Sequence, residues 1–306
     1  MKSNYLSTSL LLSLLIMSCE SHAQDDFPVL EGPYLGQKPP GLTPKIFAPN
    51  IVSINGRYEG AISFSPDLKE IYFGAKNKDQ LTGIYFSKFE DNRWTPIKKA
   101  SFTKGKKEQE IHPSVSPNGK RIYFTALNSD FTDNKVWYVN RLENSWSNAV
   151  KLDSPINGDE VFYPNQANNG NLYYFNLSNM KTYYASDNNG DFPKIKEVEL
   201  EFGVHHAFIS PSEDYLLVNA RNKEGGNRKD NDIYVCFKKR DGTWTKPINL
   251  GNDVNSNFNE KSPSISPDGK YLFFGRDQRD EEGGLANIYW VSTEIITKLK
   301  TAYLKQ

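Results

Sequence analysis

The sequence predicts an all-β protein, a five-bladed β-propeller whose last blade is completed by an N-terminal strand. Three observations predict this fold: a turn-and-strand motif that recurs five times, a third strand after each copy, and a composition that favours strands and turns over helices. The 306 residues include 18 Phe, 17 Tyr, 5 Trp, 21 Gly and 17 Pro.

The recurring motif is a tight turn followed by an apolar strand, as in Ser266-Pro-Asp-Gly-Lys-Tyr-Leu-Phe-Phe274. In this turn Pro fixes φ, Asp caps its own backbone and Gly adopts a positive φ. An apolar strand also precedes each turn, so each copy predicts a β-hairpin. The copies lie about 50 residues apart, which is the period of a propeller blade. They span Ser65–Phe73, Ser116–Phe124, Ala167–Phe175, Ser210–Val218 and Ser266–Phe274.

A third strand follows each hairpin, and a fourth follows an aromatic residue in the first four copies. The fifth copy lacks its fourth strand. Phe47-Ala-Pro49 aligns with Trp94-Thr-Pro96, so residues 45–53 are predicted to complete the last blade beside residues 271–292. This closure would leave no free sheet edge. The third strands are Ile84–Phe86, Val136–Tyr138, Thr182–Tyr184, Ile233–Val235 and Ile288–Trp290.

The turn Ser-Pro-Asp-Gly-Lys, the aliphatic-aromatic strand and a following Asn-Ile-Tyr together resemble the WD-repeat-like propeller repeat of TolB-type proteins. The best copy is Ser266–Phe274 with Asn287-Ile-Tyr289, and the resemblance covers about residues 45–295. It implies a periplasmic or surface domain of a kind that often binds proteins, peptides or glycans and that includes some sugar-cleaving lyases. The separate N-terminal α/β domain of TolB is missing from this sequence.

The N-terminus predicts export. Residues 1–18 carry Lys2 and an apolar run of signal-peptide length that is too short to span a bilayer. The run ends in Ile16-Met17-Ser18-Cys19, which resembles the bacterial lipobox, and in that family the cysteine is lipidated and becomes the mature N-terminus. The alternative is an ordinary secretory signal cut near Ala23. We expect a lipoprotein of the bacterial envelope, periplasmic or at the outer-membrane surface, anchored to the membrane through Cys19.

The mature chain is predicted to have three parts. Residues 20–44 are rich in Gly and Pro and predict a flexible tether, residues 45–295 the propeller, and residues 296–306 a C-terminal tail. Lys and Arg number 37, as do Asp and Glu, and this balance argues against a nucleic-acid partner. We expect a monomer.

The repeats also predict which residues face the central channel, because the first strand of each propeller blade lines it. Residues two apart on a strand share a face, so the positions four and six residues before each turn should form two stacked rows. The row at four is Ala61, His112, Tyr163, His206 and Ser262, and the row at six is Glu59, Glu110, Val161, Val204 and Glu260.

Three hypotheses follow for this ring. The first is a binding pocket whose carboxylates and imidazoles hydrogen-bond a polar ligand. The second is catalysis, because His, Tyr and Glu side chains can exchange protons in a concave site. The third is a structural role, in which the glutamates only join neighbouring blades. The candidate catalytic residues are Glu110, His112, Tyr163 and His206.

The binding hypothesis includes residues beyond these four. Arg221 and Arg276 end second strands and could contact an anionic ligand such as an acidic sugar, or pair with an acid across a loop. His112, His206 and Glu110 form the best metal cluster, but no metal-binding motif is present, so we predict no cofactor. The candidate binding residues are Glu59, Glu110, His112, Tyr163, His205, His206, Glu260, Arg221 and Arg276.

Taken together, these patterns favour non-catalytic recognition of a protein partner or a glycan. The alternative is a carbohydrate-active enzyme, a lyase acting on an acidic oligosaccharide at the channel mouth. A third hypothesis is a subunit of an envelope machine. Glycan binding predicts an open mouth with an exposed aromatic ring, whereas a protein partner predicts a broad apolar patch on one rim.

Overall fold

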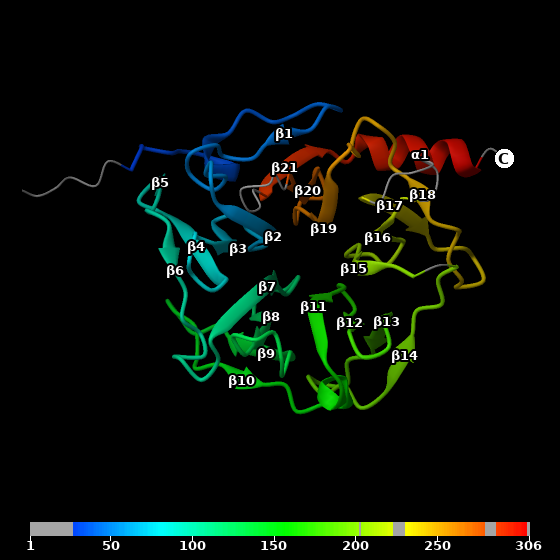
Figure 1. The fold of residues 1–306 in the computed structure, drawn as a ribbon, viewed down its shortest axis with the longest axis horizontal. Helices are drawn as coiled ribbons and strands as arrows, with labels where there is room; N and C mark the ends of the chain where they lie inside the picture. Colours follow the sequence, from blue (N-terminus) through cyan, green and yellow to red (C-terminus); the bar gives the residue numbers. More distant parts are fainter. Residues whose placement is uncertain (1–26, 202, 223–229, 279–285, 305–306) are drawn as a thin grey trace, which may run out of the picture.

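The computed structural model describes residues 27–201, 203–222, 230–278 and 286–304. The described chain is all-β with little helix, and its sheets surround a common centre in the manner of a β-propeller (Figure 1). The predicted leader, lipobox and Cys19 lie outside the described residues. No helix within the described ranges is both long and apolar enough to cross a membrane.

Three of the sheets each contain four consecutive antiparallel strands. The first comprises β7 (Gln109–Val115), β8 (Arg121–Leu127), β9 (Lys135–Asn140) and β10 (Val150–Lys151). The second comprises β11 (Val161–Gln166), β12 (Leu172–Asn176), β13 (Lys181–Ala185) and β14 (Ile195–Glu197), and the 3-10 helix η2 (Pro155–Gly158) precedes it. The third comprises β15 (His205–Ile209), β16 (Tyr215–Arg221), β17 (Asn231–Phe237) and β18 (Ile248–Asn249).

The remaining strands form a nine-stranded sheet made of two antiparallel parts. A single parallel pair, Tyr58 with Ala286, joins the two parts. One part comprises β2 (Tyr58–Phe64), β3 (Glu70–Lys76), β4 (Gly83–Glu90), β5 (Arg93–Trp94) and β6 (Lys98–Lys99). The other comprises β19 (Asn259–Ile265), β20 (Tyr271–Asp277), β21 (Ala286–Ser292) and β1 (Lys45–Ile46).

The repeated turn has the chemistry that its sequence predicts. In the copy at Ser266 the serine Oγ accepts a hydrogen bond from the backbone N of Tyr271 at 3.0 Å. Asp268 Oδ1 accepts one from the backbone N of Lys270 at 3.1 Å, and Gly269 has a φ of 74°. These contacts satisfy the turn, so β20 begins at a defined residue and in a defined register.

The segment predicted to complete the last sheet pairs where its alignment places it. Lys45 and Ile46 pair antiparallel with Trp290 and Tyr289 of β21. The backbone N of Phe47 donates to the carbonyl O of Ile288 at 2.8 Å, and the Phe47 ring is fully buried. An N-terminal strand is therefore paired with a C-terminal sheet.

The predicted domain boundaries differ from the structure at both ends. Within the predicted tether, η1 (Pro33–Gly36) buries Tyr34 and Leu35 in the core, and the Tyr34 hydroxyl donates to Asp268 at 2.7 Å. At the other end, helix α1 (Glu294–Leu304) replaces the predicted tail and buries Ile295 and Ile296. Burial of apolar surface explains both differences. Aromatic and aliphatic residues in these otherwise polar segments pack against the sheets.

Candidate functional site

Five inner strands contact one another in a circuit, one from each four-stranded sheet and one from each part of the nine-stranded sheet. In order they are β2, β7, β11, β15 and β19, and β19 contacts β2. Each of these strands contains a β-bulge, seen as a shift in its pairing register. At each bulge one residue has a positive φ, which is uncommon for residues other than glycine. These residues are Ala61, His112, Tyr163, His206 and Ser262, which form the row predicted four residues before each turn.

Three of these bulge side chains pack against one another and close the centre of the molecule. The ring of His112 lies 5.2 Å from that of Tyr163 and 5.3 Å from that of His206, measured between centroids. The rings of Tyr163 and His206 are 4.9 Å apart. The Tyr163 hydroxyl donates a 2.6 Å hydrogen bond to the carbonyl O of Pro263, which belongs to β19, two inner strands away. We call His112, Tyr163 and His206 the floor.

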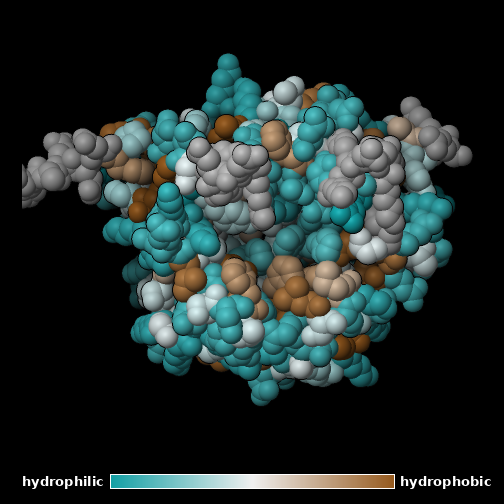
Figure 2. Space-filling model, in the orientation of Figure 1, coloured by the Kyte–Doolittle hydropathy of each residue, from teal (hydrophilic) through white to brown (hydrophobic). Residues whose placement is uncertain are grey.

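A cavity of about 540 Å³ lies beside the floor. Small residues make the space: Gly60 and Ala61 on β2, Gly74 on β3 and Ser262 on β19 all line it. Figure 2 shows the hollow at the centre of this face, with hydrophobic residues gathered on its β7 and β11 side and hydrophilic ones opposite. The other lining residues are Tyr58, Lys76, Thr82, Ile111, His112, Phe131, Asn134, Phe162 and Leu177.

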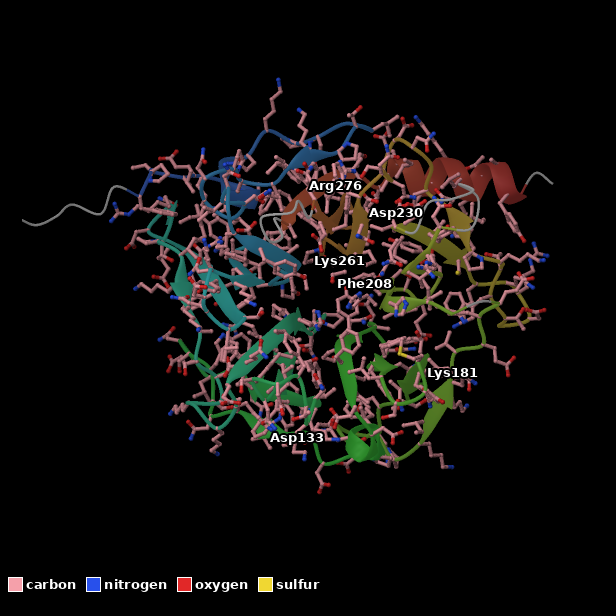
Figure 3. The ribbon with its side chains drawn as sticks, in the orientation of Figure 1. Asp133, Lys181, Phe208, Asp230, Lys261 and Arg276 are labelled. Atoms are coloured by element: carbon pink, nitrogen blue, oxygen red, sulfur yellow. The ribbon has the colours of Figure 1, made fainter. Side chains whose placement is uncertain are left out.

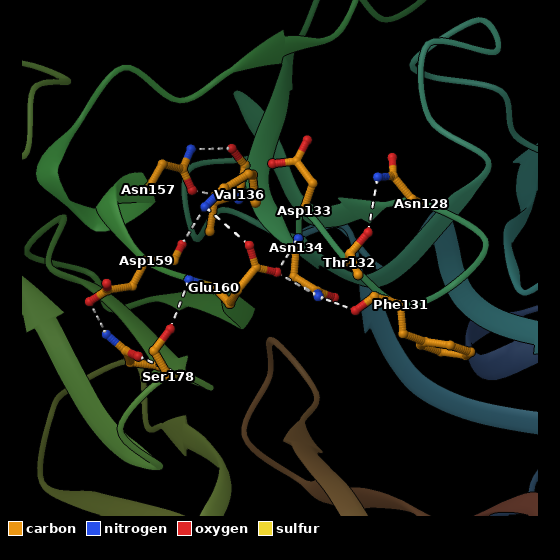
Figure 4. Close-up of polar contacts among 12 residues, drawn as sticks. Asn128, Phe131, Thr132, Asp133, Asn134, Val136, Asn157, Asp159, Glu160 and Ser178 are labelled. Atoms are coloured by element: carbon orange, nitrogen blue, oxygen red, sulfur yellow. Dashed lines mark hydrogen bonds and ion pairs between the residues drawn. The ribbon is translucent and has the colours of Figure 1, made fainter.

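Phe131 presents an exposed aromatic ring at the mouth of this cavity. The residue is 62% exposed and lies on the short loop between β8 and β9. Hydrogen bonds within the loop and to Glu160, which directly precedes β11, hold the loop (Figure 4). Asn134 Nδ2 donates to the Phe131 carbonyl at 2.7 Å, while Glu160 accepts hydrogen bonds from Asn134 N at 2.7 Å and Asn134 Nδ2 at 2.9 Å. The backbone that carries the ring is therefore held in place before any ligand arrives.

The floor is electrically neutral. Burial, assisted by the charge of Lys261, lowers the pKa of His112 to about 3. Burial and the neighbouring His112 lower the pKa of His206 well below its usual value, and burial raises the pKa of Tyr163 well above its own. His206 Nδ1 lies 3.0 Å from Asn219 Oδ1, whereas His112 Nδ1 is buried with no hydrogen-bond partner among the described residues. The floor carries no charge, and His112 is its one residue in the described cavity lining, where it can offer a hydrogen bond to a ligand.

The predicted glutamate row does not share this site. Glu59 pairs with Arg57 and accepts from the backbone N of Ile54, and Glu110 accepts from the backbone N of Thr103 at 2.6 Å. Glu260 accepts a hydrogen bond from Ser256 Oγ. Each carboxylate thus holds the loop that enters its own strand, which is a structural role but not the predicted link to a neighbouring blade.

The bulge explains why the prediction of two stacked rows is wrong. It inserts one residue into the strand, so the residues four and five before the turn both reach the cavity side. Gly60, Ile111 and Phe162, all at the fifth position, line the cavity, whereas the glutamates at the sixth do not. No Asp or Glu lines the cavity within the described ranges.

The two arginines and His205 also lie outside the cavity lining. Arg276 donates to Glu260 at 2.7 Å and to the carbonyl of Val254 at 2.7 Å, so its charge is already paired. Figure 3 labels it farther from the centre than Lys261, whose Nζ lies 2.8 Å from Asp277. Arg221 is exposed at the end of β16, and the His205 ring packs 5.5 Å from that of Phe175.

The metal cluster considered from sequence does not form. Glu110 is bonded to the backbone of Phe102 and Thr103 and does not join His112 and His206. Across the part of the chain that the structure describes, no group of three His, Cys, Asp or Glu residues could hold a metal ion.

The sequence analysis did not identify Phe131, Phe162, Tyr58, Lys76 or Asn134 as lining residues. One signal could have revealed the bulges. Proline follows the bulge residue in three strands, and proline inside a strand is confined to edges and bulges. These prolines are Pro113, Pro164 and Pro263.

Comparison with known proteins supports the fold only. No protein-family model matches the chain, and no curated protein matches its sequence. Among solved structures, a GH43 endo-arabinanase from Bacillus licheniformis matches with a TM-score of 0.51 at 13% identity, over 75% of this chain and 91% of that one. The catalytic domain of the Coprinopsis cinerea GH62 α-L-arabinofuranosidase matches with a TM-score of 0.50 at 9% identity, over 82% and 97%.

TolB from Acinetobacter baumannii matches with a TM-score of 0.46 at 14% identity, over 75% of this chain. The match covers only 53% of that TolB chain, about half of its length. The chain is thus an all-β protein whose structural neighbours include TolB-like β-propellers at low sequence identity.

Proposed function

We propose that this protein is a non-catalytic binding protein of the bacterial envelope that recognises a carbohydrate in the cavity beside Phe131. The scaffold would be a five-bladed propeller closed by β1. The contacts of β2, β7, β11, β15 and β19 in a circuit support this count, as does the pairing of Lys45 and Ile46 with β21.

The envelope location rests on the sequence. Cys19 follows a signal-like apolar run, and lipidation there would hold the protein on a membrane. Replacing Cys19 with Ala should move the protein from the membrane fraction to the soluble fraction. If the variant stays in the membrane fraction, the anchor lies elsewhere.

The observation that carries the carbohydrate proposal is the exposed Phe131 ring at the mouth of a cavity with a neutral, hydrogen-bonding floor. A sugar ring has an apolar C–H face that packs on aromatic rings and hydroxyl groups that need hydrogen-bond partners. Phe131 can supply the first contact, while His112, Ser262 and Tyr58 can supply the second. Lys76 adds an exposed cation to the lining, so a carboxylate-bearing sugar would also be accommodated.

The lining does not favour catalysis. Glycoside hydrolysis ordinarily needs two carboxyl groups flanking the scissile bond, and the described lining contains none. A lyase needs a base whose pKa lies near the working pH, but the pKa of His112 is lowered to about 3. The Tyr163 hydroxyl already donates a hydrogen bond to the carbonyl O of Pro263. Of the four candidate catalytic residues, His112, Tyr163 and His206 therefore act better as a floor than as reagents, and Glu110 holds the loop at Thr103.

A protein partner is the second candidate, and one observation favours it. Leu81, Phe131 and Met180 are 38%, 62% and 48% exposed and lie on loops between the second and third strands of successive sheets. A partner that covers this rim would bury all three side chains, whereas a sugar in the cavity would need only Phe131.

The test is a calorimetric binding screen against neutral and uronic-acid oligosaccharides, with a parallel assay for new reducing or unsaturated ends. We expect binding without product, and we expect Phe131→Ala to weaken binding roughly tenfold. Phe258→Ala is the matched control, because Phe258 is 42% exposed but does not line the cavity. Equal binding by wild type and Phe131→Ala, or no binding to any sugar, would contradict the proposal.

A further inference from the structure

We infer that the cavity is a blind pocket that receives only the end of a carbohydrate chain and excludes internal segments. This inference rests on the proposed function and concerns the way in which the ligand enters. It follows from the floor, the walls and the unpaired polar atom at the bottom.

The floor blocks passage along the axis. The Tyr163 hydroxyl donates a hydrogen bond to the Pro263 carbonyl, and the centroids of the His112 and His206 rings lie 5.3 Å apart. A chain threaded through the centre would have to break the Tyr163 hydrogen bond and separate these rings. Within the described ranges, the floor therefore leaves the mouth as the way into the cavity.

Further side-chain hydrogen bonds connect the inner strands beyond the floor. Ser264 Oγ donates to the carbonyl of Ile62 at 2.8 Å, joining β19 to β2. Asn165 Nδ2 donates to the carbonyl of Ala207 at 2.8 Å, and Asn165 Oδ1 accepts from the backbone N of Ile209 at 2.8 Å. These cross-links hold the inner strands in place, so the floor is not expected to open for a ligand.

The described walls of the cavity come from three neighbouring sheets. Tyr58 and Lys76 line the cavity from β2 and β3, whereas Phe131 and Leu177 line it from loops of the next two sheets. The volume of about 540 Å³ matches a small-molecule site rather than an extended groove. One or two sugar rings fit such a space.

The bottom of the pocket suits a terminal hydroxyl group. His112 lines the cavity, and its Nδ1 is one of the buried side-chain atoms without a hydrogen-bond partner in the described structure. A chain end carries a hydroxyl that an internal residue has lost to its glycosidic bond. Placed near His112 and Ser262, that hydroxyl can satisfy polar groups that a methylene or an ether oxygen would leave unpaired.

The experiment uses polygalacturonate and xylan, each divided into fractions of short, medium and long chains. Binding of the full-length protein is measured by calorimetry as moles of protein per mole of chain. We expect one protein per recognised chain end at every length, with the affinity per chain unchanged within about twofold. A stoichiometry that rises in proportion to chain length would overturn the inference while leaving the proposed function intact.

A second arm modifies the chain ends chemically, first the reducing end and then the non-reducing end. Loss of binding after either modification supports the inference and identifies the end, whereas unchanged binding after both overturns it. Failure of every fraction to bind would overturn the proposed function itself.

A filling variant tests the pocket directly. Ala61→Phe places a ring in the cavity, and we expect at least a 30-fold loss of affinity for short chains. Ala61→Ser is the matched control at the same backbone position and should bind like wild type. The melting temperature of each variant shows that the fold is retained. Undiminished binding by a folded Ala61→Phe protein would contradict the blind pocket.

Discussion

The two sides of the central axis use the same position of the repeat in opposite ways. On β7, β11 and β15 the bulge residues are His112, Tyr163 and His206, whose rings pack against one another. On β19 and β2 they are Ser262 and Ala61, which leave space. One backbone geometry thus produces a packed floor on one side and a cavity on the other.

This difference shows that the site is made by side-chain volume and not by a change of fold. Every inner strand carries its bulge, including those with Ala and Ser, so the positive φ is a property of the repeat. Backbone strain can point to a functional site, but here its repetition assigns it to the architecture. Only the side chains at the bulges separate the packed side from the open side.

The largest expected effect tests this division by truncating one residue on each side. Tyr163→Ala removes a buried ring and its hydrogen bond to Pro263, and we expect unfolding to become about 3–5 kcal/mol easier. Ser262→Ala removes only a hydroxyl that lines the cavity and should change stability by less than about 1 kcal/mol. Urea denaturation measures both. Similar losses for the two variants would break the comparison.

The division was only partly predictable from the sequence. The repeats aligned the five bulge residues correctly, because the turn serines are a fixed distance from them. They also placed Phe47 beside the last sheet, where its backbone bonds to Ile288. Both successes came from counting residues between strong turn signals.

Face assignment failed because alternation assumes an unbroken strand. A bulge changes which residues share a face, and no glycine marks it at Ala61, His112 or Tyr163. Phe131 was missed for a different reason. Its position depends on Asn134, which donates hydrogen bonds to the Phe131 carbonyl and to Glu160. Asn134 and Glu160 precede strands of two different sheets. Neither the extra residue nor these contacts follow from periodicity.

The second prediction uses pH, because the floor contains two histidines whose pKa values are lowered by burial. The pKa of His112 is lowered from 6.5 to about 3, so the folded state favours the neutral ring. The stability associated with this residue is complete above pH 6.5 and is lost as the pH falls towards 3, by up to about 1.4 kcal/mol per pH unit.

The measurement is the free energy of unfolding of wild type and His112→Phe between pH 7.5 and pH 4.5. The phenylalanine ring keeps the packing against Phe162 and Tyr163 but takes up no proton. We expect a shallower decline for the variant, whereas Ser262→Ala should follow wild type. Parallel curves for wild type and His112→Phe would show that His112 has no part in the pH dependence.

The smallest expected effect concerns Glu160, which positions the mouth loop on the floor side. Glu160→Ala removes the acceptor for Asn134, and we expect a loss of about 1 kcal/mol in stability. Because Asn134 also holds the Phe131 carbonyl, sugar affinity should fall about threefold, and hydrogen exchange at the Phe131 amide should quicken.

Two further variants separate positioning by Glu160 from a general effect of charge. Glu160→Gln keeps an acceptor oxygen and should restore both affinity and slow exchange. Glu197→Ala removes an exposed carboxylate that pairs with Lys181 at 2.8 Å on β13 and β14, so it should change neither, because exposed ion pairs stabilise little. Glu160→Gln could instead lower the affinity and quicken the exchange as much as Glu160→Ala does. The charge of Glu160, and not its hydrogen bonds, would then act on the sugar. The rest of the loop would then position Phe131.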